Sequence, residues 1–317
     1  MKKPLVVLTG PTAVGKTSLS INLAKKINGS IISADSMQVY KYMDIGTAKI
    51  TTEEMDNVKH YLIDEFEPFE DFNVARFLEY SKKYIEEIYK AGKIPILVGG
   101  TGFYIQAVLK DVDFKETVED SEYRKELENI AKTKGNEFLH SMLKEVDIES
   151  ANAIHANNTK RVIRALEYYK ITGEKISLHN ETEKSKESPY NYSYFVLNDL
   201  RENLYKRIDL RIDKMIEDGL IDEVQLLKDK GCTKEMVSMK GLGYKEILDY
   251  LDQNCTLDEA IYVLKRDTRH FAKRQLTWFK RENDVIWVNK NEFKYDENSI
   301  LEYIINILRE RGIYNGH

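Results

Sequence analysis

The chain has 317 residues, of which 42% are hydrophobic and 32% charged, with a net charge of −5. This composition fits a globular protein with a hydrophobic core and excludes a nonspecific polyanion binder, and no apolar run approaches the length of a membrane span. The two cysteines, Cys232 and Cys255, lack the spacing of metal ligands, so we expect a reducing compartment, the cytoplasm, and no zinc site.

The first third of the chain alternates apolar runs with helical patterns. The run after the two N-terminal lysines is too short for a signal peptide and leads into a glycine-rich loop, so we interpret it as a strand. Strands are predicted at 5–8, 30–34, 59–64 and 94–98, with helices from the loop at 10–17 to about 27, at 74–90 after an Asn73 cap, and from 102 toward 109. This alternation predicts an α/β fold with a mainly parallel sheet flanked by helices.

The composition changes near residue 111. From there to about 190 the sequence is polar and helix-periodic, which predicts an all-helical insertion at 113–190 within a core of 1–112 and 191–317. In the resumed core we expect strands at 192–198 and near 284, and helices at 200–218, 220–230, 244–251 and 257–280.

A complete phosphate-loop motif lies between the first strand and the first helix. The segment GPTAVGKT matches G-x-x-x-x-G-K-[ST] in the structural context that the motif requires. Backbone amides at a helix N-terminus bind anions, a lysine adds a positive charge, and a threonine hydroxyl can ligate Mg²⁺. The motif predicts a phosphate or diphosphate site, used either by a kinase or to hold a diphosphate leaving group. Its residues are Gly10, Pro11, Thr12, Ala13, Val14, Gly15, Lys16 and Thr17.

Two further loops end predicted strands. Asp35 follows the second strand and can contact Mg²⁺, act as a general base on a neutral acceptor, or cap the following turn. Thr101 lies in GGTGF after the strand at 94–98 and can bind a ligand or cap the next helix. Because parallel strands present their carboxyl ends at one edge, we expect these loops to share a site with the phosphate loop.

The motifs together resemble the tRNA dimethylallyltransferase family, the tRNA isopentenyl-type transferases of bacteria. The resemblance rests on GPTAVGKT, DSMQVYKYMDIGTAK and GGTGFYIQAVL, and on NNTKRVIRALEYY, MKGLGYKEI and AKRQLTWFKR further along the chain. It implies a P-loop NTPase-like core with a helical insertion that embraces the tRNA anticodon stem-loop. The implied reaction transfers the dimethylallyl group of dimethylallyl diphosphate to the exocyclic amine of the adenosine 3′ of the anticodon.

The resemblance also assigns catalytic roles. Asp35 matches the general base, and Thr101 matches the residue that holds the same amine or its carboxylate partner. Lys16, Mg²⁺ on Thr17, and Arg211 at the position of a diphosphate-contacting arginine are expected to stabilise the leaving group. Arg207 lies one helical turn before Arg211 and either assists or forms a surface ion pair.

Contacts with tRNA are expected in three regions. Near the acceptor they are Asp35, Thr101, Ser36, Met37 and Gln38. In the insertion they are Arg124, on a loose local match, and the stretch Lys160, Arg161, Val162, Ile163 and Arg164, whose apolar members also suit a plain amphipathic helix. In the third region, 265–281, seven Lys or Arg residues accompany one Asp, which favours either a solvated helix face or a phosphate-binding surface. Lys273 and Arg274 are the expected contacts there, whereas Trp278 and Phe279 are expected in the core.

Two alternatives remain at this stage. A P-loop nucleoside or small-molecule kinase shares Lys16 and Thr17, but it would carry an arginine-rich lid. A noncatalytic GTPase-like RNA-binding module would need an N-K-x-D element, which the sequence lacks. We expect a monomer, and because no cysteine or histidine cluster follows Trp287, we expect no zinc-binding extension.

Overall fold

The computed structural model describes residues 2–114 and 121–316, and the chain divides into two compact units. The core unit comprises Met1–Leu109 and Pro189–His317, and the helical unit comprises Lys110–Ser188. Each unit is described by itself. No helix in the described part of the chain is both long enough and apolar enough to cross a membrane.

A six-stranded sheet of wholly parallel strands forms the centre of the core unit. Its strand order is β3-β2-β4-β1-β5-β6, so β1 lies between two strands that come much later in the chain. The predicted α/β class is therefore confirmed. The strands are β1 (Lys3–Thr9), β2 (Gly29–Ala34), β3 (His60–Tyr61), β4 (Ile94–Gly99), β5 (Tyr190–Asn198) and β6 (Val285–Asn289).

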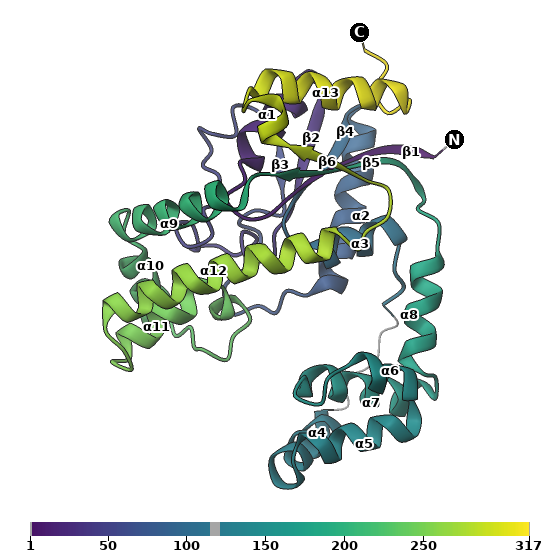
Figure 1. Cartoon of the computed structure of the whole chain (residues 1–317), viewed down its shortest axis with the longest axis vertical. Coiled ribbons are helices and arrows are strands. Elements are labelled where there is room, and N and C mark those ends of the chain that lie inside the picture. Colours follow the sequence, from purple (N-terminus) through teal and green to yellow (C-terminus); the bar gives the residue numbers. More distant parts are fainter. Residues whose placement is uncertain (1, 115–120, 317) are drawn as a thin grey trace. The chain divides into compact units, whose positions relative to one another are not determined.

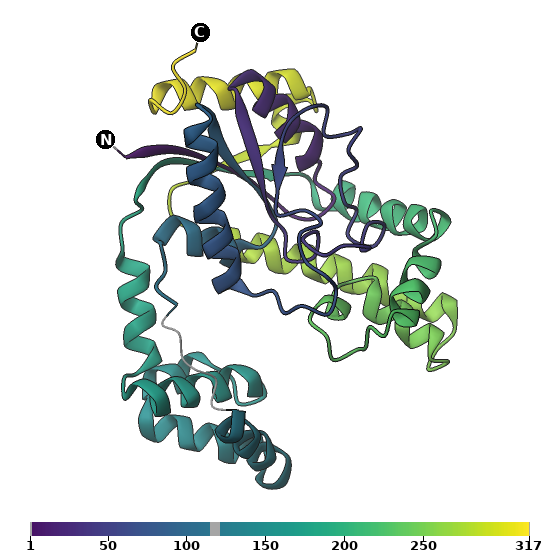
Figure 2. The ribbon, with the colours of Figure 1, turned by 180° about the vertical axis from the view of Figure 1, so that it is seen from behind.

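The central strands are apolar without alternation because helices cover both sides of the sheet. All six residues of β2 are buried, as are the last five of β1. In Figures 1 and 2, α1 (Lys16–Lys26) and α13 (Glu297–Glu310) lie on one side of the sheet, and α2 (Val74–Lys90) and α3 (Gly102–Lys110) on the other. Asn73 caps α2 as expected, since its side-chain oxygen accepts hydrogen bonds from the Ala75 and Arg76 amides, both at 3.0 Å.

A second group of helices follows β5 and carries residues toward the carboxyl ends of the strands. Within this group α9 contacts α10 and α12, and α11 contacts α10 and α12. The helices are α9 (Arg201–Glu217), α10 (Leu220–Asp229), α11 (Tyr244–Leu251) and α12 (Leu257–Phe279). Short 3₁₀ segments lie at Ser238–Lys240 and Lys290–Phe293.

Two elements of the core unit differ from prediction. Strand β3 has two residues instead of six, because Leu62 and Asp64 adopt left-handed conformations (φ 60° and 55°) that turn the chain away. Helix α13 was not predicted. It begins at an Asp296 cap and buries one apolar face against α1 and β5.

The helical unit has a hydrophobic core of its own. Helices α4 (Ser121–Lys134), α5 (Asn136–Val146) and α7 (Thr159–Thr172) supply most of it, with α6 (Ile148–Ala153) and α8 (Ile176–Ser185) alongside. The fully or nearly buried members are Leu127, Leu139, Leu143, Ala151, Val162, Ile163, Ala165 and Leu166. Because it has a hydrophobic core of its own, this unit meets a main criterion for a domain.

Candidate functional site

The phosphate loop connects β1 to α1 through a backbone that only particular residues adopt. Ala13 and Gly15 have positive φ angles of 61° and 94°, and Gly15 sits at the N-cap of α1. Lys16 Nζ donates to the carbonyl oxygens of Gly10 and Pro11, each at 2.9 Å. The lysine is thus folded over the loop, in position to add its charge to the anion site at the helix N-terminus.

The loop after β2 uses one oxygen of Asp35 for structure. Asp35 Oδ1 accepts hydrogen bonds from the backbone amides of Met37 at 2.8 Å and Gln38 at 3.3 Å. The capping role considered for this carboxylate therefore exists. Asp35 Oδ2 makes no hydrogen bond with any residue in 2–114 or 121–316. Capping and a chemical role are compatible, since they use different oxygens.

The loop after β4 lies directly beside Asp35. The Thr101 amide donates to the carbonyl oxygen of Ala34 at 3.2 Å, and Ala34 pairs with Gly99 across the two strands. The Thr101 carbonyl accepts from the Tyr104 and Ile105 amides and so starts α3, whereas its hydroxyl is unbonded within the described structure. Thr101 caps its helix through the backbone and leaves its hydroxyl for another partner.

Two cations share the electrostatic surroundings of Asp35. Burial lowers the pKa of Lys16 from 10.5 to about 7; the nearby charge of Arg211 acts in the same direction, and Asp35 opposes both. The pKa of Arg211, on α9, is also lowered by burial and raised by Asp35. Arg211 nevertheless remains accessible to solvent. Lys16, Arg211 and Asp35 therefore lie close enough at the carboxyl edge of the sheet for their charges to interact.

Arg207 forms an ion pair, and its partner is a buried carboxylate. Its Nη2 contacts Oδ2 of the buried Asp199 at 2.5 Å, and its Nε donates to the Ala13 carbonyl at 2.9 Å. Burial acts to raise the pKa of Asp199, but the hydrogen bond from Arg207 and others outweigh it and hold that pKa below its ordinary value. Arg207 thereby fixes the apex of the phosphate loop at its left-handed residue.

A buried glutamine joins two of the loops, and sequence reasoning missed it. Gln275 on α12 accepts from the Thr12 amide through Oε1 at 2.9 Å and donates to the Gly100 carbonyl through Nε2 at 3.0 Å. The available signal was its place on the buried stripe of α12, three residues after Ala272 and four before Phe279. A polar residue on that stripe needs buried partners.

The residues expected near the acceptor are only partly available. Ser36, Met37 and Gln38 are all half-buried. The Gln38 amide already donates to the carbonyls of Thr47 at 3.2 Å and Ala48 at 3.4 Å and accepts from the Ser33 hydroxyl at 3.3 Å. Gln38 therefore orders the loop that follows Asp35, a role that the sequence did not indicate.

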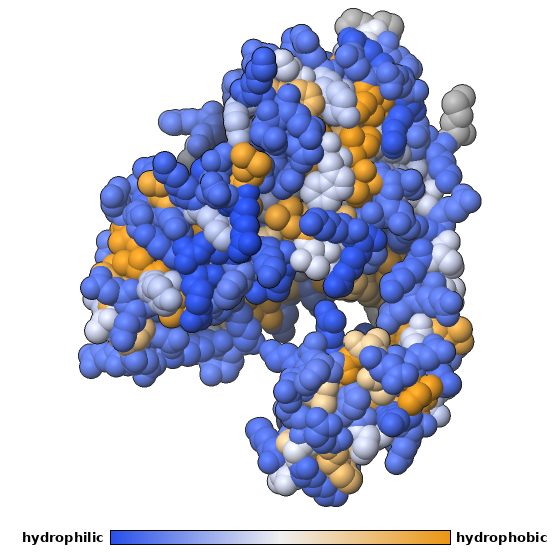
Figure 3. Space-filling model, viewed as in Figure 1, coloured by the Kyte–Doolittle hydropathy of each residue, from blue (hydrophilic) through white to orange (hydrophobic). Residues whose placement is uncertain are grey.

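The exposed face of α12 carries Lys273 and Arg274, and most of this face appears hydrophilic in Figure 3. Its opposite face is buried, and Trp278 packs there, with its ring close to Gly102 and edge-on to Phe103 at 6.2 Å. Phe279 is fully buried. The expectation of a core position is confirmed for Phe279, whereas Trp278 is half-buried at the edge of the core.

The helical unit contains part of the expected contact set. Val162 and Ile163 lie in its core, 0% and 5% exposed, as expected for an amphipathic helix, so the cations of this stretch are the side chains left for a contact with tRNA. Arg124 forms a bidentate pair with the carboxylate of the buried Glu167, both contacts at 2.8 Å, which engages it inside the unit. Lys160, Arg161 and Arg164 are exposed on α7.

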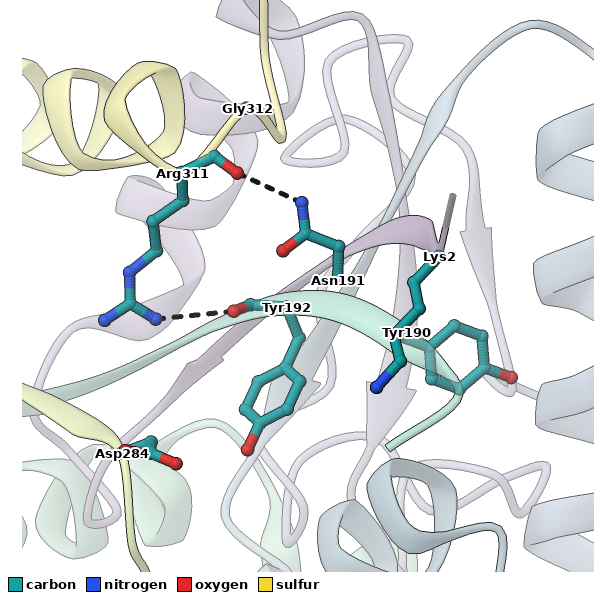
Figure 4. Close-up of a pocket in the computed structure, with 7 residues that line it drawn as sticks. All are labelled: Lys2, Tyr190, Asn191, Tyr192, Asp284, Arg311 and Gly312. Carbon is teal, nitrogen blue, oxygen red and sulfur yellow. Dashed lines mark hydrogen bonds between the residues drawn. The ribbon is translucent and has the colours of Figure 1, made fainter. Parts of the chain in front are cut away.

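A shallow pocket of about 460 Å³ lies at the opposite, amino edge of the sheet (Figure 4). There Asn191 Nδ2 donates to the Arg311 carbonyl at 3.0 Å, and Arg311 Nη1 donates to the Tyr192 carbonyl at 3.4 Å. These contacts tie the end of α13 to β5. The pocket is separated from the three loops by the length of the strands and contributes nothing to them.

A parallel sheet with a phosphate loop between its first strand and first helix, and a carboxylate at the end of the next strand, defines the class of P-loop proteins. The IPP transferase family model matches residues 38–282, and the chain belongs to that family. The expected family and enzyme class, a transferase, are confirmed.

Individual relatives agree over nearly the whole chain. A tRNA dimethylallyltransferase of Lachnoclostridium phytofermentans is 63% identical over 98% of this chain and 99% of its own. The full-length tRNA isopentenylpyrophosphate transferase of Bacillus halodurans is 47% identical over 98% of each chain, with a TM-score of 0.74. A eukaryotic dimethylallyltransferase, solved acting on tRNA, is 32% identical over 90% of this chain and 74% of its own, with a TM-score of 0.78.

Proposed function

We propose that the chain transfers the dimethylallyl group of dimethylallyl diphosphate to the N6 amine of the adenosine 3′ of the anticodon in tRNA, releasing diphosphate. The observation that carries the proposal is that the loops after β1, β2 and β4, which carry Lys16, Asp35 and Thr101, meet at the carboxyl edge of the sheet, where only Oδ1 of Asp35 is used to hold its own loop. A kinase can place a carboxylate in the same way beside a hydroxyl acceptor, so this geometry alone does not select between the two reactions. The names of the relatives supply the substrates.

The phosphate loop and the two cations serve the leaving group. As the bond between the allylic carbon and the diphosphate oxygen breaks, its electron pair moves to that oxygen. Loop amides, Lys16 and Arg211 stabilise the charge that develops there. Arg207 and Asp199 keep the loop in its binding conformation through the Ala13 carbonyl.

Asp35 and Thr101 serve the acceptor. The adenine amine is a weak nucleophile, so it requires a base as the new carbon–nitrogen bond forms. Asp35 Oδ2 takes the proton while Oδ1 holds the loop, and the Thr101 hydroxyl orients the same amine. The adenosine has to leave the anticodon stack to reach these groups, as bases do in other enzymes that modify them.

The residues present fit a Mg²⁺ ion. Thr17 is exposed in the first turn of α1, and its hydroxyl makes no hydrogen bond within the described structure. Mg²⁺ is commonly bound by one or two protein oxygens together with phosphate oxygens and water. When bound, it would supply positive charge to the diphosphate, with Thr17 as the protein ligand.

We further propose which residues contact tRNA and where the protein acts. The tRNA anticodon stem-loop would contact Lys273 and Arg274 in the core unit and Lys160, Arg161 and Arg164 in the helical unit. Ser36 and Met37 would border the flipped adenosine. The protein would act as a monomer in the cytoplasm, where unmodified tRNA is found.

The test is incubation of the protein with dimethylallyl diphosphate, Mg²⁺ and unmodified tRNA, followed by mass analysis of the nucleosides. We expect one adenosine per tRNA to gain a dimethylallyl group. A parallel incubation with ATP instead of the diphosphate should leave tRNA and small nucleosides unphosphorylated. Phosphoryl transfer without prenylation would contradict the proposal.

Asp35→Asn is the sharper variant for the catalytic role. Asparagine keeps an oxygen for the Met37 and Gln38 amides, so the loop stays in place, but it cannot accept the proton. Transfer should fall by at least about 100-fold, the usual contribution of a general base, with tRNA affinity nearly unchanged. Full activity in this variant would remove Asp35 from the mechanism.

A further inference from the structure

The Gln275 side chain accepts a hydrogen bond from one loop and donates a hydrogen bond to another. Its carbonyl oxygen accepts from the Thr12 amide of the phosphate loop, and its NH₂ group donates to the Gly100 carbonyl, one residue before Thr101. The side chain is 6% exposed, so water does not compete for these partners. Only an amide of this length supplies an acceptor and a donor from one rigid plane.

The bond to Gly100 continues to the acceptor carboxylate. Thr101, the next residue, donates its amide to the Ala34 carbonyl, and Asp35 follows Ala34. On the other side of the loop, the Thr9 hydroxyl donates to the Gly99 carbonyl at 2.6 Å. A short series of hydrogen bonds thus runs from the phosphate loop through Gln275 and Gly100 to the loop of Asp35.

Steric contact makes this connection tight. A Cβ atom at Gly100 would lie 2.2 Å from Gln275 Nε2, and one at Gly102 would lie 2.2 Å from Trp278 Cδ1. Gln275 and Trp278 lie three residues apart on the same face of α12. The helix is therefore seated on the backbone of the loop itself, and the glycines are required by close approach.

We propose that Gln275 is a positioning residue that sets the separation between the diphosphate loop and the acceptor loop. The inference rests on the proposed function, in which one loop holds the leaving group and the other the attacking amine. Transfer requires the two reacting atoms at a defined distance and angle, and errors of about 1 Å cost roughly 100-fold in rate. Gln275 touches neither substrate, so its loss should lower the rate of the bound complex and spare binding.

The first test compares Gln275→Glu with Gln275→Met. Glutamate can still accept from Thr12 but cannot donate to Gly100, whereas methionine fills a similar volume and makes neither bond. We expect kcat to fall about 10-fold for the first and up to about 100-fold for the second. The Kd of each substrate and the KM values should stay within about threefold. Unchanged kcat in Gln275→Met, or a loss confined to KM, would overturn the inference.

A double-mutant cycle tests the contact itself. Gly100→Ala should collide with Gln275 and lower kcat strongly. In a Gln275→Ala background the colliding atoms are gone, so Gly100→Ala should add little further loss. Additive effects would overturn the inference, because they would mean that the two positions act separately. This cycle remains informative when one single variant is poorly stable, since rescue of Gly100→Ala by the second change is the expected result.

Different results would contradict the proposed function and the positioning role of Gln275. Absence of prenyl transfer by the unaltered protein sinks the proposed function. Transfer by the unaltered protein together with full kcat in Gln275→Met sinks the positioning role alone.

Discussion

At the scale of single residues, the site contains two cations, Lys16 and Arg211, whose charged forms are disfavoured by burial. Burial and the proximity of Arg211 disfavour the ammonium form of Lys16, and its pKa falls to about 7. An arriving diphosphate reverses this balance because it adds negative charge beside the amine. The lysine therefore gains affinity for a proton when the anion binds.

This balance predicts a pH dependence of diphosphate binding. Below pH 7 Lys16 is already protonated in the free protein; above pH 7 a proton must be taken up on binding, so affinity should fall by up to about tenfold per pH unit between pH 7 and 9. Calorimetry in buffers of different ionisation enthalpy measures the uptake. Lys16→Arg keeps a permanent charge and should abolish the uptake; a persisting slope in that variant would assign the proton to another group.

The sequence predicted the charged residues of the site but not the side chains that hold its loops by hydrogen bonds to the backbone. Asp35, Lys16 and Arg211 were predicted from motifs and lie together. The roles of Gln275 and Gln38 depend on backbone atoms far away in the chain, which no local pattern encodes. The pairing of Arg124 with Glu167 was unforeseen for the same reason, since the two residues lie 43 positions apart, on α4 and α7.

At the scale of elements, the basic residues of α12 fall into a group that α9 pairs and a group on the exposed side. Lys265 pairs with Asp213 at 2.5 Å and Arg269 with Asp209 at 2.6 Å, so α9 neutralises the first part of the helix. Lys273 and Arg274 follow on the exposed side. The ion-paired face is thus observed on the first turns of the helix, whereas a phosphate-binding surface is a proposal for the turn that carries Lys273 and Arg274.

Replacing Lys273 and Arg274 with alanine should weaken tRNA binding and flatten its salt dependence. Each lost phosphate contact reduces the slope of log affinity against log salt by about 0.7 to 0.9. Titrations at several salt concentrations give the slope. Lys265→Ala is the matched control, because its charge is already paired and the slope should stay unchanged. An unaltered slope in the double variant would place the tRNA elsewhere.

Most elements of the core unit were predictable because their signals are local. Asn73 and the apolar period define α2, and uninterrupted apolar runs define β1, β2 and β4. The shortening of β3 depends on two left-handed residues, Leu62 and Asp64, that could equally have been extended. Helix α13 carries an Asp296 cap and an apolar stripe, which are local signals, so it too was predictable from the sequence.

At the scale of the whole molecule, two units with separate cores carry different parts of the proposed work. The phosphate loop, Asp35, Thr101 and Arg211 all belong to the core unit. In the helical unit, α7 has exposed cations on one face and buries Val162 and Ile163 in the core on the other. Diphosphate binding and part of the RNA binding are therefore expected to be separable.

Lys160→Ala with Arg161→Ala should test this separation. tRNA affinity should fall severalfold and the salt slope by about 1.4 to 1.8, while diphosphate affinity stays the same. Lys132→Ala with Lys144→Ala removes equal charge from exposed positions elsewhere on the helical unit and should have a smaller effect. Equal losses in the two pairs would indicate a diffuse electrostatic contribution instead of a contact on α7.

The hydrogen bond between Thr12 and Gln275 spans 263 positions of the chain, and it has a consequence for synthesis. The phosphate loop leaves the ribosome early, but β5, Arg207 and α12, which flank and hold it, emerge much later. Long-range contacts form slowly, and domains tend to fold as their residues emerge. The helical unit can acquire its core while the phosphate loop still lacks its supports. A nascent or prematurely terminated chain should therefore contain a folded helical unit long before it contains an ordered site, so the enzyme becomes competent only in the last stage of its translation.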